Sequence, residues 1–284
     1  MQTAASPDNQ TNETKNKDKK KQKDQGPLGH SWLVRYGKRL RKPTNRILVK
    51  YSKVGDPPVY PAYTFDWQKD IEANWQVIRD EALGVLSHRS AVPVLREVSP
   101  DHDRIAVDEK WQSYFLWGYG YRMHMNCDRC PQTAKIAERI PGLRSAFFSI
   151  HAPHLHIPRH KGVTKGMLTC HLGLAVPKER SKCRMMVEDQ ELVWEEGKSF
   201  VFDDTYHHEV WNDTEDDRVI LLVQFDRPLR FPGNLLYKAF MRGIRWSPFV
   251  QDAKRNVLKW DKSYSESEAK AAKDQTSDSD SKAA

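Results

Sequence analysis

A series of short apolar segments between residues 145 and 226 constrains the fold more than any other feature of this chain. Glycine, proline, aspartate and asparagine separate segments that are predicted strands at 145–151, 167–176, 182–188, 198–203, 208–212 and 218–226. Within the second of these, Leu168, Leu172 and Leu174 alternate with other residues, which places His171 on the opposite face of the strand. Many short strands at even spacing predict a β-sandwich or a small barrel.

Helices are expected on both sides of this β region. Apolar residues recur at helical spacing over 67–87, and Asp66 stands where an N-cap is expected. The aromatic segment 111–121 has the character of a strand. A short helix is predicted at 131–139, where a proline begins it, and further helices are predicted at 234–260.

These elements divide the chain into five parts. The basic tail at 1–26 and the tail at 261–284 contain almost no large apolar side chains, so both are predicted to be disordered. A helical and extended segment at 27–105 is expected to pack on a β domain at 106–230. Helices at 231–260 complete the folded part.

The net charge of +8 is spread unevenly, with one basic run at Lys15–Lys23 and a second within 31–50. Such patches dock on anionic lipid or nucleic acid, although a solvated tail is the more ordinary interpretation. The segment 31–50 either makes peripheral contact with a membrane or packs on the domain. Nucleic-acid binding is disfavoured because the lysine run has no interleaved aromatic residues. With no apolar run near the roughly 18 residues of a membrane span and no signal-peptide pattern, we expect a cytoplasmic protein, with attachment to the inner membrane face as an alternative.

Four cysteines are present, and two of them form a single C-x-x-C pair at Cys127 and Cys130. A structural zinc site normally needs four ligands, and Cys170 and Cys183 do not form a second pair of this kind. The pair is therefore interpreted as a structural, redox-silent turn rather than a zinc or thioredoxin-like site.

The histidines are the strongest chemical signal. Four of the 11 lie between His151 and His160, and two more are His207 and His208. Neutral imidazole is the commonest side-chain ligand for iron, zinc and copper, and 48 residues between His160 and His208 suit two ligands on different strands. From spacing alone, satisfied polar histidines remain the more common alternative, and this is the expectation for His151 and its nearest neighbours.

Two further features sharpen the metal hypothesis. Arg218 lies on the last apolar strand, where a buried guanidinium needs an anion such as a dicarboxylate. Asp203 and Asp204 precede His208 and offer carboxylates that could orient an imidazole.

Several sequence motifs together resemble those of a known enzyme family. In order along the chain, they are Ser149, His160-Lys-Gly162, Leu168-Thr-Cys-His171-Leu-Gly-Leu174, Trp194-Glu-Glu-Gly197-Lys, Phe202-Asp-Asp-Thr-Tyr-His-His208-Glu-Val-Trp211-Asn and Arg218. Together they resemble the aspartyl/asparaginyl β-hydroxylase family over about residues 110–230, and more weakly its bacterial members, including lipid A acyl-chain hydroxylases, on either side. The resemblance implies a mainly β protein with flanking helices, whose core is a double-stranded β-helix of the jelly-roll or cupin-like kind. It also implies a dependence on Fe(II), 2-oxoglutarate and O₂.

The resemblance also assigns roles to residues. His160 and His208 are the expected iron ligands and the core of the catalytic site, and Gly162 stands where many related oxygenases place a third, carboxylate ligand. Arg218 is expected to pair with the distal carboxylate of 2-oxoglutarate, helped by Ser149, and His171 is expected to contact the co-substrate.

A substrate pocket is expected around Trp117, taken as an aromatic residue at its mouth, together with His151 and Thr169. The family usually has arginine where this chain has Thr169, which bears on substrate class and activity.

The implied function is a dioxygenase that hydroxylates an aspartyl or asparaginyl side chain or a lipid acyl chain and releases succinate and CO₂. The partner is then a peptidyl or a lipid substrate. The alternative is a metal-binding barrel with impaired catalysis that acts as a sensor or binding module. Nucleic acid remains the weakest candidate partner.

Overall fold

The computed structural model describes residues 32–98, 105, 108–118, 120–246, 250–252, 254–260, 262 and 264–266. The chain forms two units, Met1–Arg46 and Ile47–Ala284. The described part of the first unit is the beginning of helix α2 (Trp32–Lys50), whose last turn belongs to the second unit. The predicted tail at 1–26 and most of the tail at 261–284 lie outside the described residues. Within the described residues, no helix combines the length and the apolar character needed to cross a membrane.

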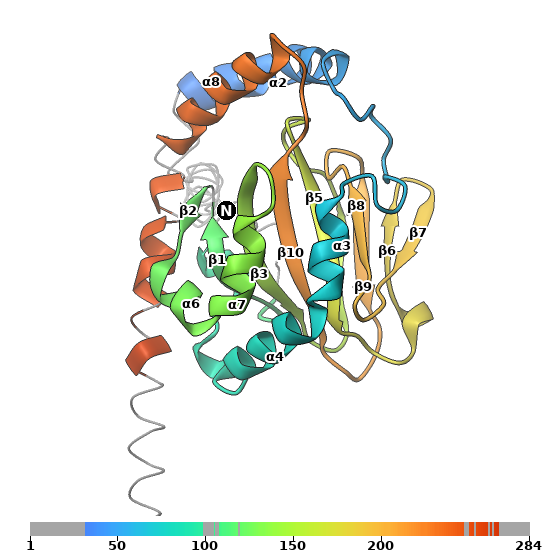
Figure 1. Cartoon of the computed structure of the whole chain (residues 1–284), viewed down its shortest axis with the longest axis vertical. Helices are drawn as coiled ribbons and strands as arrows, with labels where there is room; N and C mark the ends of the chain where they lie inside the picture. The colour runs from blue at the N-terminus through green and yellow to red at the C-terminus, as the bar shows by residue number, and fades with distance from the viewer. Residues whose placement is uncertain are drawn as a thin grey trace, which may run out of the picture. The chain divides into compact units, whose positions relative to one another are not determined.

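The second unit is built around two antiparallel sheets (Figure 1). The larger has the strand order β2-β1-β3-β10-β5-β8, and the smaller has the order β4-β9-β6-β7. Their bounds are β1 Trp111–Gly118, β2 Tyr121–Arg122, β3 Leu143–His151, β4 Leu155–His160, β5 Met167–Ala175, β6 Cys183–Val187, β7 Gln190–Val193, β8 Ser199–Phe202, β9 His208–Asn212 and β10 Arg218–Asp226. From β3 to β10 the chain passes from one sheet to the other at nearly every connection, which is the winding of a jelly roll. The predicted double-stranded β-helix is confirmed.

The larger sheet has two distinct buried faces because successive side chains of a strand point in opposite directions. Leu172 of β5 and Phe148 of β3 belong to the core beneath the helices, which we call the helix side. Phe147 of β3 and Leu222 of β10 belong to the core shared with the smaller sheet, which we call the inner face. The predicted orientation of His171 is confirmed, because its ring contacts aromatic residues of the inner face.

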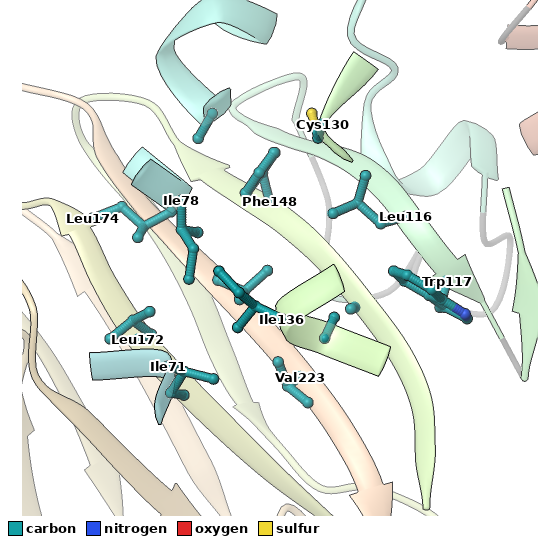
Figure 2. Packing of buried hydrophobic residues seen from close by; sticks show 14 of the residues in the cluster. Ile71, Ile78, Leu116, Trp117, Cys130, Ile136, Phe148, Leu172, Leu174 and Val223 are labelled. Carbon is teal, nitrogen blue, oxygen red and sulfur yellow. The ribbon is translucent and has the colours of Figure 1, made fainter. Parts of the chain in front are cut away.

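Short helices cover the helix side of the larger sheet: α3 (Trp67–Ala73), α4 (Trp75–Leu86), α6 (His124–Arg129) and α7 (Pro131–Glu138). Figure 2 shows Ile71, Ile78 and Ile136 from three of these helices packed against strand residues that include Leu172 and Val223. Burial of each such side chain contributes roughly 1.5–3 kcal/mol. The predicted helix at 131–139 is therefore observed as α7, held by its apolar stripe.

The helix predicted over 67–87 is wrong in one respect, because the structure divides it at Asn74 into α3 and α4. The Asn74 amide donates to the backbone carbonyl of Asp70 at 2.8 Å, a local bond that competes with the regular helical pattern. Asp66 does not cap α3, since its own backbone is helical and its side chain accepts no capping bond. The Gln68 side chain instead reaches back and accepts the backbone N–H of Phe65 at 3.3 Å.

Other elements were not predicted from the sequence. Strands β4 and β7 and the short helices α5 (Leu95–Val98) and α6 carry too few regularly spaced apolar residues to stand out. The aromatic segment 111–121 forms β1 and the beginning of a hairpin to β2. The first of the predicted C-terminal helices is α8 (Gly233–Arg245), which begins one residue earlier than expected.

The cysteine pair has the structural character that the sequence indicates. Cys127 and Cys130 are free thiols and fully buried at α6. The Cys127 Sγ donates to the backbone carbonyl of Leu116 at 3.3 Å. Burial raises the pKa of Cys127 to about 11 and raises that of Cys130 further, so both remain protonated and unreactive at neutral pH.

Candidate functional site

The two histidines singled out by spacing meet across the smaller sheet. His160 ends β4, His208 begins β9, and the two residues are directly paired in the strand register. Their ring centroids lie 4.1 Å apart. The jelly roll thus brings together two imidazoles that are far apart in sequence.

Both rings are held in the same tautomer. Nδ1 of His160 lies 2.8 Å from the backbone carbonyl of Pro158, and Nδ1 of His208 lies 3.0 Å from that of Tyr206. A carbonyl oxygen only accepts, so each Nδ1 carries the proton and each Nε2 keeps its lone pair.

The electrostatics of the pair favour neutral rings. Burial lowers the pKa of His160, and burial together with the neighbouring His160 ring lowers the pKa of His208 to about 4. Two neutral imidazoles with fixed orientation and free Nε2 atoms are a donor set that suits a divalent transition metal.

The position two residues after His160 is filled by another part of the chain. The backbone N–H of Gly162 donates to the carbonyl of Asp204 at 2.6 Å, and a Cβ added at Gly162 would overlap the Asp204 carboxylate. A side chain at this position would require the Asp204 carboxylate to move. Within the described residues, no group of three or more histidine, cysteine, aspartate or glutamate side chains is arranged to hold a metal.

Arg218 is a buried cation without an anion. It begins β10 on the inner face, is 1% exposed, and its guanidinium stacks 4.4 Å from the ring centroid of Trp194. Its Nη2 donates to the Ser149 hydroxyl at 3.4 Å, whereas Nε and Nη1 have no hydrogen-bond partner. Burial lowers the pKa of Arg218 to about 10, which leaves it protonated at neutral pH. A desolvated guanidinium with two free donor nitrogens is a receptor for a carboxylate.

Further polar groups surround Arg218. His151 pairs with it across β3 and β10, and neither ring nitrogen of His151 has a partner. Trp111 stacks edge-on against His151 and donates its Nε1–H to Ser149 at 3.0 Å. Thr169 on β5 is also buried with an unpartnered hydroxyl, but it lies away from this group, because it pairs with Gln224 near the opposite end of β10 from Arg218. The unpaired polar atoms of Arg218 and His151 indicate a site built for a polar ligand, because orphaned buried groups are rare in folded proteins.

His171 connects the arginine region with the histidine pair. Its Nδ1 accepts the Nε1–H of Trp194 at 3.4 Å, and burial lowers its pKa well below the usual value, so the proton of the neutral ring lies on Nε2. Phe202 contacts both His171 and His208, at centroid distances of 5.1 and 5.5 Å. One contiguous aromatic wall therefore joins the proposed metal ligands to the anion receptor.

Trp117 is the predicted site residue that the structure places elsewhere. It is 7% exposed and belongs to the core on the helix side of the larger sheet, where Figure 2 shows it beside Leu116. A bulge between Phe115 and Trp117 shifts the register of β1 against β3 and turns Trp117 away from the inner face. Its assignment to the pocket mouth is wrong.

The carboxylates before His208 also differ from expectation. Asp203 does not orient an imidazole, since one of its oxygens pairs with the fully buried Arg227 and lies 3.1 Å from Lys165. Its other oxygen accepts the backbone N–H of Thr205 at 2.9 Å and so shapes the turn that leads to His208. Backbone carbonyls perform the orienting role that the sequence assigned to these side chains.

Two residues of the site, Trp111 and Trp194, had no role assigned from the sequence, and Asp204 was expected to orient an imidazole rather than to fill the space beside Gly162. Alternation along β1 places Trp111 on the same face as Phe115, which was the signal available for it. Trp194 stacks on Arg218, and Asp204 packs on Gly162. Both contacts join residues far apart in sequence, so no local sequence pattern indicates them.

Comparisons with known proteins bear on this arrangement. Residues 72–228 match the family described as Aspartyl/Asparaginyl beta-hydroxylase. The chain is 40% identical over 222 residues to the ornithine lipid ester-linked acyl 2-hydroxylase of Rhizobium tropici, with 78% of this chain and 79% of that protein covered. It is 35% identical over 165 residues to the aspartyl/asparaginyl beta-hydroxylase of Homo sapiens, with 56% of this chain and 21% of the human protein covered. A solved prolyl-4-hydroxylase of Pseudomonas putida aligns with a TM-score of 0.30 and 20% identity over 42% of this chain and 72% of that one.

The matched region contains His160, His208 and Arg218 and extends over more than half of the chain. The chain belongs to the aspartyl/asparaginyl β-hydroxylase family.

Proposed function

We propose that this protein is an Fe(II)- and 2-oxoglutarate-dependent dioxygenase that hydroxylates a lipid acyl chain. One observation carries the proposal: a pair of neutral, oriented imidazoles and an unpaired buried arginine stand on the same inner face. His160 and His208 supply nitrogen donors that Fe(II) accepts, and Arg218 supplies the cation that a dicarboxylate co-substrate requires. When bound, Fe(II), 2-oxoglutarate and O₂ supply the oxidising chemistry that turns a C–H bond into C–OH with release of succinate and CO₂.

The protein's own residues orient the metal donors, bind the carboxylate of the co-substrate and exclude water. The carbonyls of Pro158 and Tyr206 keep the Nε2 atoms of the two histidines available, which fixes the donors before a metal arrives. Arg218 and the Ser149 hydroxyl hold a carboxylate, and the Nε2–H of His171 is a further donor on the same wall. The aromatic wall excludes water from this region, so each of these polar interactions is stronger than it would be in solvent.

Two observations support a lipid substrate: the number of buried cations at the site and the similarity of the chain to a lipid hydroxylase. Two arginines are fully buried among the described residues, and Arg227 is already paired with Asp203. Arg218 is thus the cation left for the co-substrate, and a substrate aspartyl carboxylate would need a second one, which Thr169 does not provide. An uncharged acyl chain suits the inner face, where Phe147 and Leu222 provide apolar surface. The relative from Rhizobium tropici, which matches over about four fifths of both chains, carries the name of a lipid acyl hydroxylase.

The second candidate is a barrel that binds metal without catalysing hydroxylation, and it is favoured by Thr169, which stands where the family usually has arginine. An assay of the purified full chain with Fe(II), 2-oxoglutarate and O₂ distinguishes the hydroxylase from the inactive barrel. Membrane lipid and an aspartyl or asparaginyl peptide are supplied as substrates in separate reactions. The proposal predicts succinate release together with lipid that gains one oxygen atom by mass spectrometry. Succinate release only with an aspartyl or asparaginyl peptide would reassign the substrate, and no succinate with either substrate would support the inactive barrel. His156→Ala is the matched control for His160→Ala, because His156 also lies on β4 but is exposed and paired with Glu209.

A further inference from the structure

Helix α8 (Gly233–Arg245) presents an apolar surface to solvent. Its inner side is anchored, because Tyr237 and Met241 pack with Leu48 and Leu229 in a small separate core. On its other side and at its ends, large apolar side chains are exposed: Phe231 75%, Leu235 61%, Leu236 41% and Trp246 74%. We call this set, together with Lys238 and Arg242, the α8 outer face. Single exposed apolar residues are ordinary on protein surfaces, whereas four on one helix and its flanks mark an interaction surface.

The charge of this surface has one sign. No aspartate or glutamate occurs between Asp226 and Asp252, a stretch that contains Arg230, Lys238 and Arg242. Lys238 and Arg242 are exposed and enter no ion pair within the part of the chain that the structure describes. Cations beside exposed apolar side chains are typical of helices that lie in the interface of an anionic membrane.

The position of α8 relates this face to the proposed active site. Tyr237, on the inner side of α8, packs so closely on Gly166 that a Cβ at Gly166 would overlap its ring. Gly166 lies in the loop that leads from His160 to β5, and Val163 in the same loop is 60% exposed. Figure 1 shows α8 following β10 at the end of the larger sheet where β5 begins. A surface that contacts α8 therefore meets the protein beside the loop that follows the first proposed metal ligand.

We propose that the α8 outer face docks this protein on an anionic lipid bilayer. Leu235, Leu236 and Phe231 insert among the acyl chains near the headgroups, while Lys238 and Arg242 contact lipid phosphates. The inference goes beyond the proposed function and is independent of it, since docking requires neither metal nor catalysis. It does explain how an acyl chain could reach a buried site without leaving the membrane.

The test is co-sedimentation of the full-length protein with vesicles in the absence of iron. One set of vesicles is phosphatidylcholine alone, and the other contains phosphatidylglycerol as well. We expect binding to the anionic vesicles that weakens as salt is raised. Each basic residue at a membrane surface contributes about 1 kcal/mol, so Lys238→Gln with Arg242→Gln should weaken the partition coefficient about 25-fold. Leu235→Ser with Leu236→Ser should weaken it at least as much.

Matched controls use exposed residues far from α8. Leu83→Ser, at a residue 44% exposed on α4, controls for the loss of exposed apolar surface. Lys135→Gln with Lys178→Gln controls for the loss of two charges at exposed lysines. Both controls should bind as the unaltered protein does, with melting temperatures unchanged in every variant.

Several results would overturn the proposal. Equal vesicle binding by the α8 variants and the unaltered protein would show that another segment docks. Equal binding to neutral and anionic vesicles would remove the role of the cations. Self-association that Leu235→Ser abolishes, with no binding to vesicles, would show that the face is a protein interface. Failure of hydroxylation with intact vesicle binding would count against the proposed function and leave docking supported.

Discussion

Arg218 gives the sharpest test of the site, because replacing it should not destabilise the protein. Burial lowers its pKa to about 10, well below that of a free arginine side chain, and at about 1.4 kcal/mol per pKa unit this corresponds to a destabilisation of roughly 3 kcal/mol. The guanidinium is protonated at pH 7 in both the folded and the unfolded chain. The destabilisation is therefore fully present at neutral pH and is relieved only as the pH rises above about 10, where the folded chain loses the proton before the unfolded chain does.

Arg218→Met removes this penalty and loses two favourable contacts. Stacking on Trp194 contributes roughly 1–2 kcal/mol and the long bond to Ser149 about 1 kcal/mol at most. The expected net change runs from neutral to about 2 kcal/mol of stabilisation. Arg227→Met is the matched control, since Arg227 is equally buried but paired with Asp203, and its loss should destabilise the protein by about 1–3 kcal/mol, with Lys165 at 3.1 Å left as the cation beside Asp203.

Thermal unfolding with and without 2-oxoglutarate, under anaerobic conditions with Fe(II), measures both effects. The unaltered protein should gain about 3 kcal/mol of apparent stability at a ligand concentration 100 times the dissociation constant. Arg218→Met should unfold at the same or a higher temperature than the unaltered protein when no ligand is present, and should gain nothing from 2-oxoglutarate. The reasoning is refuted if Arg218→Met destabilises the free protein by more than about 2 kcal/mol, or if the shift caused by 2-oxoglutarate persists.

Other consequences of the structure can be checked on the same protein. Gly162→Asp should destabilise it by about 1–3 kcal/mol in urea unfolding without adding a metal ligand, because the Asp204 carboxylate fills the space; higher metal affinity would contradict this. Asp203→Asn should cost about 1–3 kcal/mol in the same assay, since Arg227 loses its fully buried partner and keeps the partly exposed Asp56 at 3.3 Å, and a loss below 1 kcal/mol would show that the pair is not structural. Cys127 should resist a thiol reagent in the native protein and react once the chain is unfolded, and rapid native labelling would show that the thiol is accessible.

The sequence was informative wherever a regular pattern controls the structure. The alternation around Leu172 determined which face of β5 carries His171, because the side-chain period of a strand is two. The prediction for Arg218 also rested on the strand pattern, since a charged residue at the beginning of an apolar strand is expected to be buried and then needs a counter-ion. The family resemblance added roles for residues that the structure brings to one face.

Irregular structure determines the features that no regular sequence pattern indicates. Trp117 was misplaced because a bulge in β1 reverses the faces beyond Phe115. Strand β4 was missed because Pro158 and its polar neighbours interrupt any alternation, and its pairing comes entirely from β9. The occupant of the space beside Gly162 depends on a turn more than 40 residues away, which no local pattern encodes.

The central claim is that His160 and His208 hold Fe(II) beside a site for 2-oxoglutarate. Anaerobic titration of Fe(II) into the protein with 2-oxoglutarate tests it, because a keto acid that chelates Fe(II) produces visible absorption. The account predicts a band that saturates at one iron per chain, is lost in His160→Ala and His208→Ala, and is unchanged in His156→Ala. A band that survives the double replacement of His160 and His208, or no band in the unaltered protein, would contradict it.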